Sequence, residues 1–85
     1  MNEVDTGING MVIGAVIARL NKLLSYGGAA AQVTAPGVAI ILSGMKKERY
    51  DPATIDYLLR ELRETHSQVN LVGVIAHFQT IYDRT

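Results

Sequence analysis

The sequence predicts an all-α domain of four helices that assembles as a homo-oligomer. Apolar residues recur at helical spacing along most of the chain, and prolines and capping residues stand where helices would begin. The hydrophobic fraction of 48% is high for a chain of only 85 residues. A chain of this length forms one domain with a thin stability margin, so an apolar excess favours association between copies. We expect a single domain over residues 1–85, with residues 1–8 flexible.

The first predicted helix, residues 9–25, is apolar on almost every side. A helix that is hydrophobic all round is a buried one. Because so short a chain offers little else to cover it, we infer a partner, in the first place a second copy. One face also carries a small residue at every fourth position, which would let another backbone approach closely. We expect this face at a helix–helix contact within or between subunits. The residues assigned to a subunit interface are Gly10, Gly14, Ile17, Ala18 and Leu24.

The second predicted helix covers residues 37–49. Pro36 precedes it, where its missing N–H costs nothing. Its apolar residues then follow the helical i, i+3, i+4, i+7 pattern. The alternative is a short buried strand at residues 38–42, because periodicity cannot separate helix from strand in so short a run.

The third predicted helix, residues 52–64, has Asp51 as its cap and Pro52 in its first turn. The fourth, residues 66–82, would start from a capping box formed by Thr65 and Gln68. Dense β-branched residues make a strand at residues 68–75 the alternative there. The two alternatives together would give an α/β fold with a two-stranded parallel sheet. Such a sheet needs cover on both faces, so four helices are favoured. No internal repeat is evident.

Composition excludes several classes of protein. Eight basic and eight acidic residues give formal neutrality, which disfavours nucleic acid and anionic membranes as partners. The absence of cysteine excludes disulfides and thiol catalysis. The acidic N-terminus does not match an export signal, and the apolar runs are too interrupted to span a membrane. We therefore expect a cytoplasmic protein without membrane association.

No residue pattern indicates catalysis. His66 and His77 belong to no metal-ligand pattern, and His77 is expected to be a hydrogen-bonded core or interface residue. Ser43 lies inside a predicted helix and not on a nucleophile elbow. We expect no catalytic residue, no metal and no cofactor, and therefore a protein that is not an enzyme.

The concentrated basic cluster at residues 46–50 could hold a phosphate, although basic residues also complement a helix C-terminus. Tyr26, before two glycines, could add an aromatic face. The candidate ligand-binding residues are Tyr26, Lys46, Lys47, Arg49 and Tyr50.

Our main functional hypothesis is a non-enzymatic protein that binds another protein as a regulator, inhibitor or adaptor. In its general character the chain is similar to many small bacterial and bacteriophage accessory proteins. One alternative is a protein that binds a nucleotide-like ligand at its subunit interfaces. The others are a DNA-binding regulator and a structural assembly protein.

Overall fold

The computed structural model describes residues 8–85, which form five helices and no strand. The helices are α1 (Gly10–Ser25), α2 (Gly28–Ala31), α3 (Ala35–Lys47), α4 (Pro52–Arg63) and α5 (Leu71–Asp83). The all-α prediction is therefore confirmed. The α/β alternative is wrong for the described residues, because residues 38–42 lie within α3 and residues 71–75 within α5. Of residues 1–8, which were predicted to be flexible, residues 1–7 lie outside the described residues, and Ile8 is half-buried against the core.

Helix α1 is capped by Asn9, whose side chain accepts a hydrogen bond from the Met11 N–H at 2.9 Å. The expectation that α1 needs a second copy to bury it is wrong, because α2, α4 and α5 of the same chain pack against it. One side of α1 is covered and the other is open, with Met11 84% exposed. The α1 residues buried within the chain are Val12, Ile13, Val16, Ile17 and Leu20.

Helices α3 and α4 follow the local signals closely. Helix α3 starts two residues earlier than predicted, after Thr34, with Pro36 in its first turn. It ends at Lys47 instead of residue 49, because Arg49 adopts a left-handed backbone conformation with a φ of 76°. Helix α4 is capped as predicted by Asp51, whose carboxylate accepts a hydrogen bond from the Thr54 N–H at 3.2 Å.

Helix α5 begins at Leu71, five residues later than predicted, and the proposed capping box is wrong. The Thr65 hydroxyl donates to the Glu61 carbonyl oxygen at 2.9 Å and so closes the end of α4. Asn70 caps α5 instead, because its side chain accepts a hydrogen bond from the Gly73 N–H at 3.0 Å. An isolated antiparallel bridge between Thr34 and Asn70 holds the segment before α5 in a non-helical conformation.

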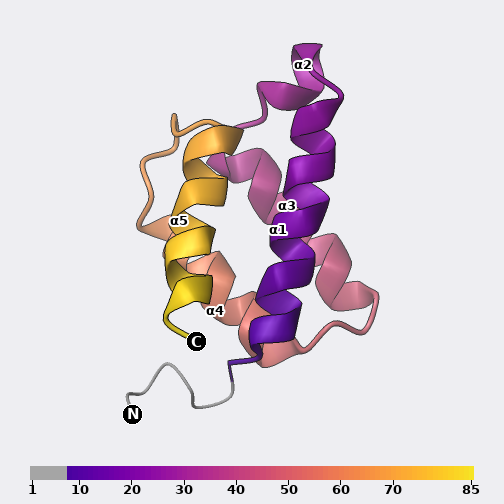
Figure 1. Cartoon of the computed structure of the whole chain (residues 1–85), viewed down its shortest axis with the longest axis vertical. Coiled ribbons are helices and arrows are strands. Elements are labelled where there is room, and N and C mark those ends of the chain that lie inside the picture. Colours follow the sequence, from indigo (N-terminus) through magenta and orange to yellow (C-terminus); the bar gives the residue numbers. More distant parts are fainter. Residues whose placement is uncertain (1–7) are drawn as a thin grey trace.

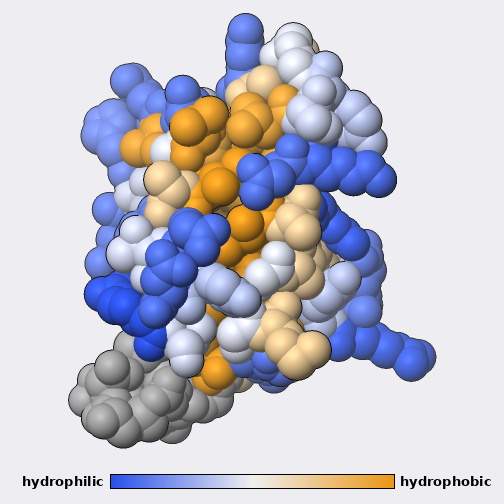
Figure 2. All heavy atoms as spheres, in the orientation of Figure 1, coloured by the Kyte–Doolittle hydropathy of each residue, from blue (hydrophilic) through white to orange (hydrophobic). Residues whose placement is uncertain are grey.

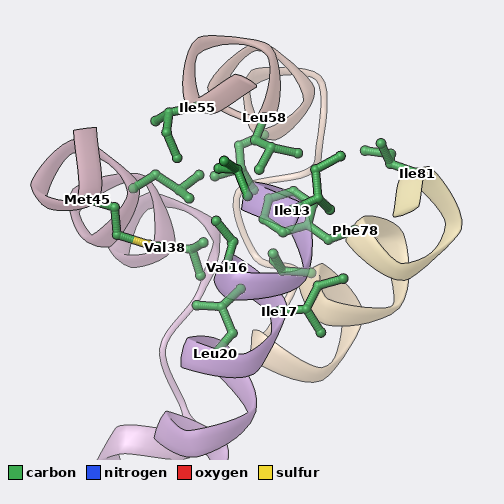
Figure 3. Close-up of a cluster of buried hydrophobic side chains, with 14 of the residues drawn as sticks. Ile13, Val16, Ile17, Leu20, Val38, Met45, Ile55, Leu58, Phe78 and Ile81 are labelled. Carbon is green, nitrogen blue, oxygen red and sulfur yellow. The ribbon is translucent and has the colours of Figure 1, made fainter. Parts of the chain in front are cut away.

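The helices are arranged as two packed pairs. Helix α1 packs along α5, and α3 packs along α4. In Figure 1 the α1–α5 pair lies in front of the α3–α4 pair. The side chains between the pairs form one core, part of which is shown in Figure 3. The fully buried large side chains are Phe78, Ile13, Leu20, Leu42, Met45, Ile55, Leu58, Leu71, Ile81, Val16, Val38 and Val74.

The two halves of the chain repeat one arrangement. In this arrangement α1 corresponds to α4, and α3 corresponds to α5. The packing of α1 against α5 then corresponds to the packing of α4 against α3, which is a pseudo-two-fold relation. Counted from their N-caps, Thr34 and Asn70, α3 and α5 bury the same four positions. These are Ala35, Val38, Leu42 and Met45 in α3, and Leu71, Val74, Phe78 and Ile81 in α5.

Side-chain contacts follow the same relation. Counted from their N-caps, Asn9 and Asp51, Gly14 of α1 corresponds to Asp56 of α4. Lys46 lies 2.9 Å from Asp56, and the corresponding Tyr82 lies against Gly14. The sequence showed no repeat because few equivalent positions are identical. The identical pairs at the start of α3 and α5 are Val33 and Val69, Gly37 and Gly73, and Val38 and Val74.

Candidate functional site

The structure does not bring together the five residues predicted to bind a ligand. Tyr26 follows the last turn of α1, beside α2, and is 67% exposed. The other four residues follow or end α3, at the opposite end of the molecule in Figure 1. Within one chain, Tyr26 and the basic cluster therefore form no common site, and a ligand site between subunits stays a prediction.

The basic cluster itself is partly neutralised. The Lys46 ammonium lies 2.9 Å from the Asp56 carboxylate, and Glu48 lies 3.3 Å from the Arg19 guanidinium. The same guanidinium lies 5.8 Å from the centre of the half-buried Tyr50 ring. Lys46 and Tyr50 thus have structural partners within the chain, which makes an anion site on this cluster weaker than the sequence indicated.

The residues predicted for a subunit interface mostly face the chain itself. A Cβ atom on Gly10 would lie 3.0 Å from the Thr85 hydroxyl, and one on Gly14 would lie 3.4 Å from the Tyr82 ring. The close approach that these glycines permit is therefore made with the C-terminal segment of the same chain. Ile17 is only 8% exposed and Leu24 is half-buried, whereas Ala18 is exposed.

A groove of about 450 Å³ opens between α3 and α4, and the segment after α4 closes one end of it. Its floor is apolar, and its rim carries three hydroxyl groups and one guanidinium group. The lining residues are Ala35, Pro36, Ala39, Ser43, Leu59, Leu62, Arg63, Thr65 and Ser67. Next to it on α3 lies Ile40, which is 74% exposed. We call this feature the α3–α4 groove.

The groove is open because α3 presents small side chains toward α4. Ala35, Ala39 and Ser43 follow one another at four-residue spacing, which places them on one side of the helix. The pseudo-equivalent positions of α5 carry much larger side chains, Leu71 and Ile75 at the first two. Figure 2 shows the corresponding apolar seam between α1 and α5. The two halves therefore share an architecture and differ in how the space between their helices is filled.

Three cations outside the described ion pairs lie on the two helices that form the α3–α4 groove, together with the carboxylate of Asp56, and Glu64 caps the end of α4. Arg63 lines the groove, and Arg60 lies one turn earlier on α4. Lys47 lies one turn beyond Ser43 on α3. None of the ion pairs between described residues uses these three cations. Asp56, on the same side of α4, is already paired with Lys46.

The two histidines have structural contacts. The His77 Nε2 atom lies 3.0 Å from a Glu61 carboxylate oxygen, a contact that ties α5 to α4. The His66 Nδ1 atom accepts a hydrogen bond from the Gln68 N–H at 3.2 Å, in the segment between α4 and α5. Within residues 8–85, no three histidine, aspartate or glutamate side chains are clustered in a way that could hold a metal ion. None of the helices in this range is long and apolar enough to cross a membrane.

Comparison of the chain with protein-family models, curated proteins and solved structures found no match. The α3–α4 groove was not anticipated from the sequence. Leu59 and Leu62 fall within the third predicted helix, residues 52–64, and Ala35 falls before the second, residues 37–49. A usable signal was the spacing of Ala35, Ala39 and Ser43, a row of small side chains facing a row of leucines.

Proposed function

We propose that this protein is a non-enzymatic binding protein that acts on another protein through the α3–α4 groove. The observation that carries the proposal is the groove itself, with an apolar floor, a few polar groups on its rim and a volume of about 450 Å³. Grooves that bind ligands are commonly mostly apolar with a small number of placed polar groups. Arg63 is the one ionisable side chain among the lining residues, which favours binding over acid–base chemistry.

The exposed apolar surface beside the groove supports a macromolecular partner. Ile40 is 74% exposed and extends the apolar floor beyond the groove, along α3. Pro36 is exposed and Leu59 is half-buried, so they continue this surface on the two walls. A contiguous apolar patch with a polar rim is characteristic of protein–protein interaction sites.

Site-specific photo-cross-linking in cells tests this proposal. A photoreactive amino acid replaces Ile40 or Ser43 beside the groove, or their pseudo-equivalents Ala76 and Gln79 on α5. All four residues are exposed, so each replacement leaves the core intact. We expect one defined protein adduct from positions 40 and 43 and none from positions 76 and 79.

A second variant links the adduct to the groove. Ala39→Ile places in the groove the side chain that α5 carries at the pseudo-equivalent position, Ile75. We expect this variant to fold and to lose the adduct formed from position 40. Adducts of the same mass from all four positions, or an adduct that persists in Ala39→Ile, would contradict the proposal.

A further inference from the structure

We infer that the segment bound by the α3–α4 groove is an acidic amphipathic helix whose aliphatic side chains replace those that this half of the chain lacks. The inference rests on the proposed function and specifies the chemistry of the partner. Three observations carry it, namely the shape of the groove, its charge and the elements that form its walls.

 The shape follows from the comparison of the two helix pairs. Counted from the N-caps of the two helices, Leu71 and Ile75 of α5 occupy the positions that correspond to Ala35 and Ala39 of α3. Both alanine side chains are much smaller than leucine or isoleucine, and they line the groove together with Leu59 and Leu62 of α4. The missing groups are thus two branched aliphatic side chains one helical turn apart. A ligand that supplies leucine or isoleucine at i and i+4 matches this space.

The charge of the groove selects the flanking residues of the ligand. Arg63 lines the groove, Arg60 lies one turn earlier on α4, and Lys47 lies one turn beyond Ser43 on α3. None of the ion pairs between described residues uses these three cations. Complementary charge at a rim favours the matching partner and penalises one of like charge. Glutamate or aspartate beside the aliphatic positions would face these cations, with bidentate hydrogen bonds available from the two guanidinium groups.

The walls of the groove favour a helix over an extended peptide. Both walls are helices, and the described residues offer no strand to which an extended segment could add. The space along α3 is bounded by residues at helical spacing, as in complexes where an amphipathic helix lies in a groove between helices. An occupying helix would place aliphatic side chains on this half at the level where α5 carries Leu71 and Ile75.

Binding of two synthetic peptides to the full chain tests the inference. Both are N-capped helices with leucine at i, i+4 and i+7, one with glutamate at the flanking positions and the other with lysine. Fluorescence anisotropy measures their affinities at low and at high salt. We expect the glutamate peptide to bind at least about tenfold more tightly than the lysine peptide at low salt, with the difference shrinking at high salt.

Three variants and one matched control locate the binding. The double substitution Arg60→Glu and Arg63→Glu changes exposed residues, and it should reverse the preference between the peptides. Ala39→Ile, and independently Ser43→Leu on the exposed rim, should weaken the glutamate peptide at least about tenfold. Ala76→Leu, a matched change on the outer face of α5, should leave the affinity unchanged. Circular dichroism confirms that each variant is folded.

Each outcome decides the inference. Equal affinity for the two peptides, an unchanged preference in the double arginine variant, or undiminished binding to both filled variants would overturn it. Its failure is distinguishable from failure of the proposed function. If the cellular adduct from position 40 is lost in Ala39→Ile while the peptides show no charge preference, the groove binds a protein of different chemistry.

Discussion

At the scale of single residues, Thr54 links the starts of two helices. It is fully buried, and its hydroxyl oxygen accepts a hydrogen bond from the Asn9 N–H at 2.8 Å. The same hydroxyl donates to the carboxylate of Asp51. Asn9 caps α1 and Asp51 caps α4, so one side chain fixes the two helix N-termini relative to each other.

We expect Thr54→Val to lower the free energy of unfolding by about 1–3 kcal/mol, because it leaves polar partners without their hydrogen bond. Thr80→Val is the matched control, since Thr80 is exposed on α5 and donates only to the Ala76 carbonyl oxygen. That control should change stability by no more than about 0.5 kcal/mol. Urea denaturation measures both variants, and an equal effect would contradict the linking role of Thr54.

Two helical glycines have opposite surroundings. A Cβ atom on Gly44 would have no neighbour within 4 Å, whereas one on Gly73 would lie 2.6 Å from the Val69 side chain. We expect Gly44→Ala to stabilise the protein by up to about 1 kcal/mol, the difference in helix propensity. Gly73→Ala should not increase the stability, because the Val69 side chain is β-branched and cannot easily move away from the added methyl group. Thermal unfolding should give Gly44→Ala a higher melting temperature than Gly73→Ala. The reverse order would contradict the close contact between residue 73 and the Val69 side chain.

At the scale of elements, the start of α5 is decided by a tertiary contact and not by the local capping pattern. Thr65 and Gln68 have the spacing of a capping box, yet the helix begins at Leu71. The Ala35 N–H donates to the Val69 carbonyl oxygen at 3.1 Å, a bond that a helix over residues 66–70 could not make. The N-termini of α3 and α5 are thus fixed side by side, and this contact orients the two halves of the chain relative to each other.

We expect Asn70→Ala to lower the free energy of unfolding by about 1 kcal/mol, the usual effect of losing an N-cap side chain. Gln68→Ala should have an effect within about 0.5 kcal/mol, because Gln68 is exposed and no helix starts beside it. Chemical denaturation of the two variants distinguishes the observed cap from the capping box that the sequence indicated. A larger effect of Gln68→Ala would contradict the observed start of α5.

At the scale of the whole molecule, the two halves are interlocked. The main helix contacts, α1 with α5 and α3 with α4, both join the first half of the chain to the second. Neither half therefore has a complete hydrophobic interior of its own, and the core side chains of all four longer helices meet in one cluster (Figure 3). This arrangement makes unfolding of one pair without the other costly.

We expect the described helices to unfold as one cooperative unit. Leu42→Ala, in α3, removes a fully buried side chain and should lower stability by about 2–5 kcal/mol. Native-state hydrogen exchange should then show the same loss of protection for the central amides of α5 as for those of α4. Selective loss in α3 and α4 would show that the pairs unfold separately.

The predicted homo-oligomer is also a property of the whole molecule. Its original premise, an uncovered α1, no longer holds, and the exposed apolar residues left on the α1–α5 side include Met11, Val72 and Tyr82. The oligomer stays a prediction that light-scattering mass tests directly. A mass of 9.2 kDa over a hundredfold range of concentration would contradict it.

The sequence by itself determined that the chain is helical and where most helices lie. Asp51 and Pro52 mark the start of α4, and the apolar spacing places the second helix within two residues of α3. These signals work because caps and helical periodicity act between residues no more than about four positions apart. The groove could be predicted from the sequence only in part. The row of small residues on α3 can be recognised in the sequence, but the helix that packs opposite it cannot.

Only the tertiary structure decided which surfaces are covered. Helix α1 is as apolar as the sequence indicated, but its cover comes from helices of the same chain. The same packing leaves Ala35 and Ala39 opposite α4 as a groove, while it fills the pseudo-equivalent space beside α1 with Leu71 and Ile75. Which helix packs against which depends on contacts between residues far apart in the chain, and no local pattern encodes that pairing.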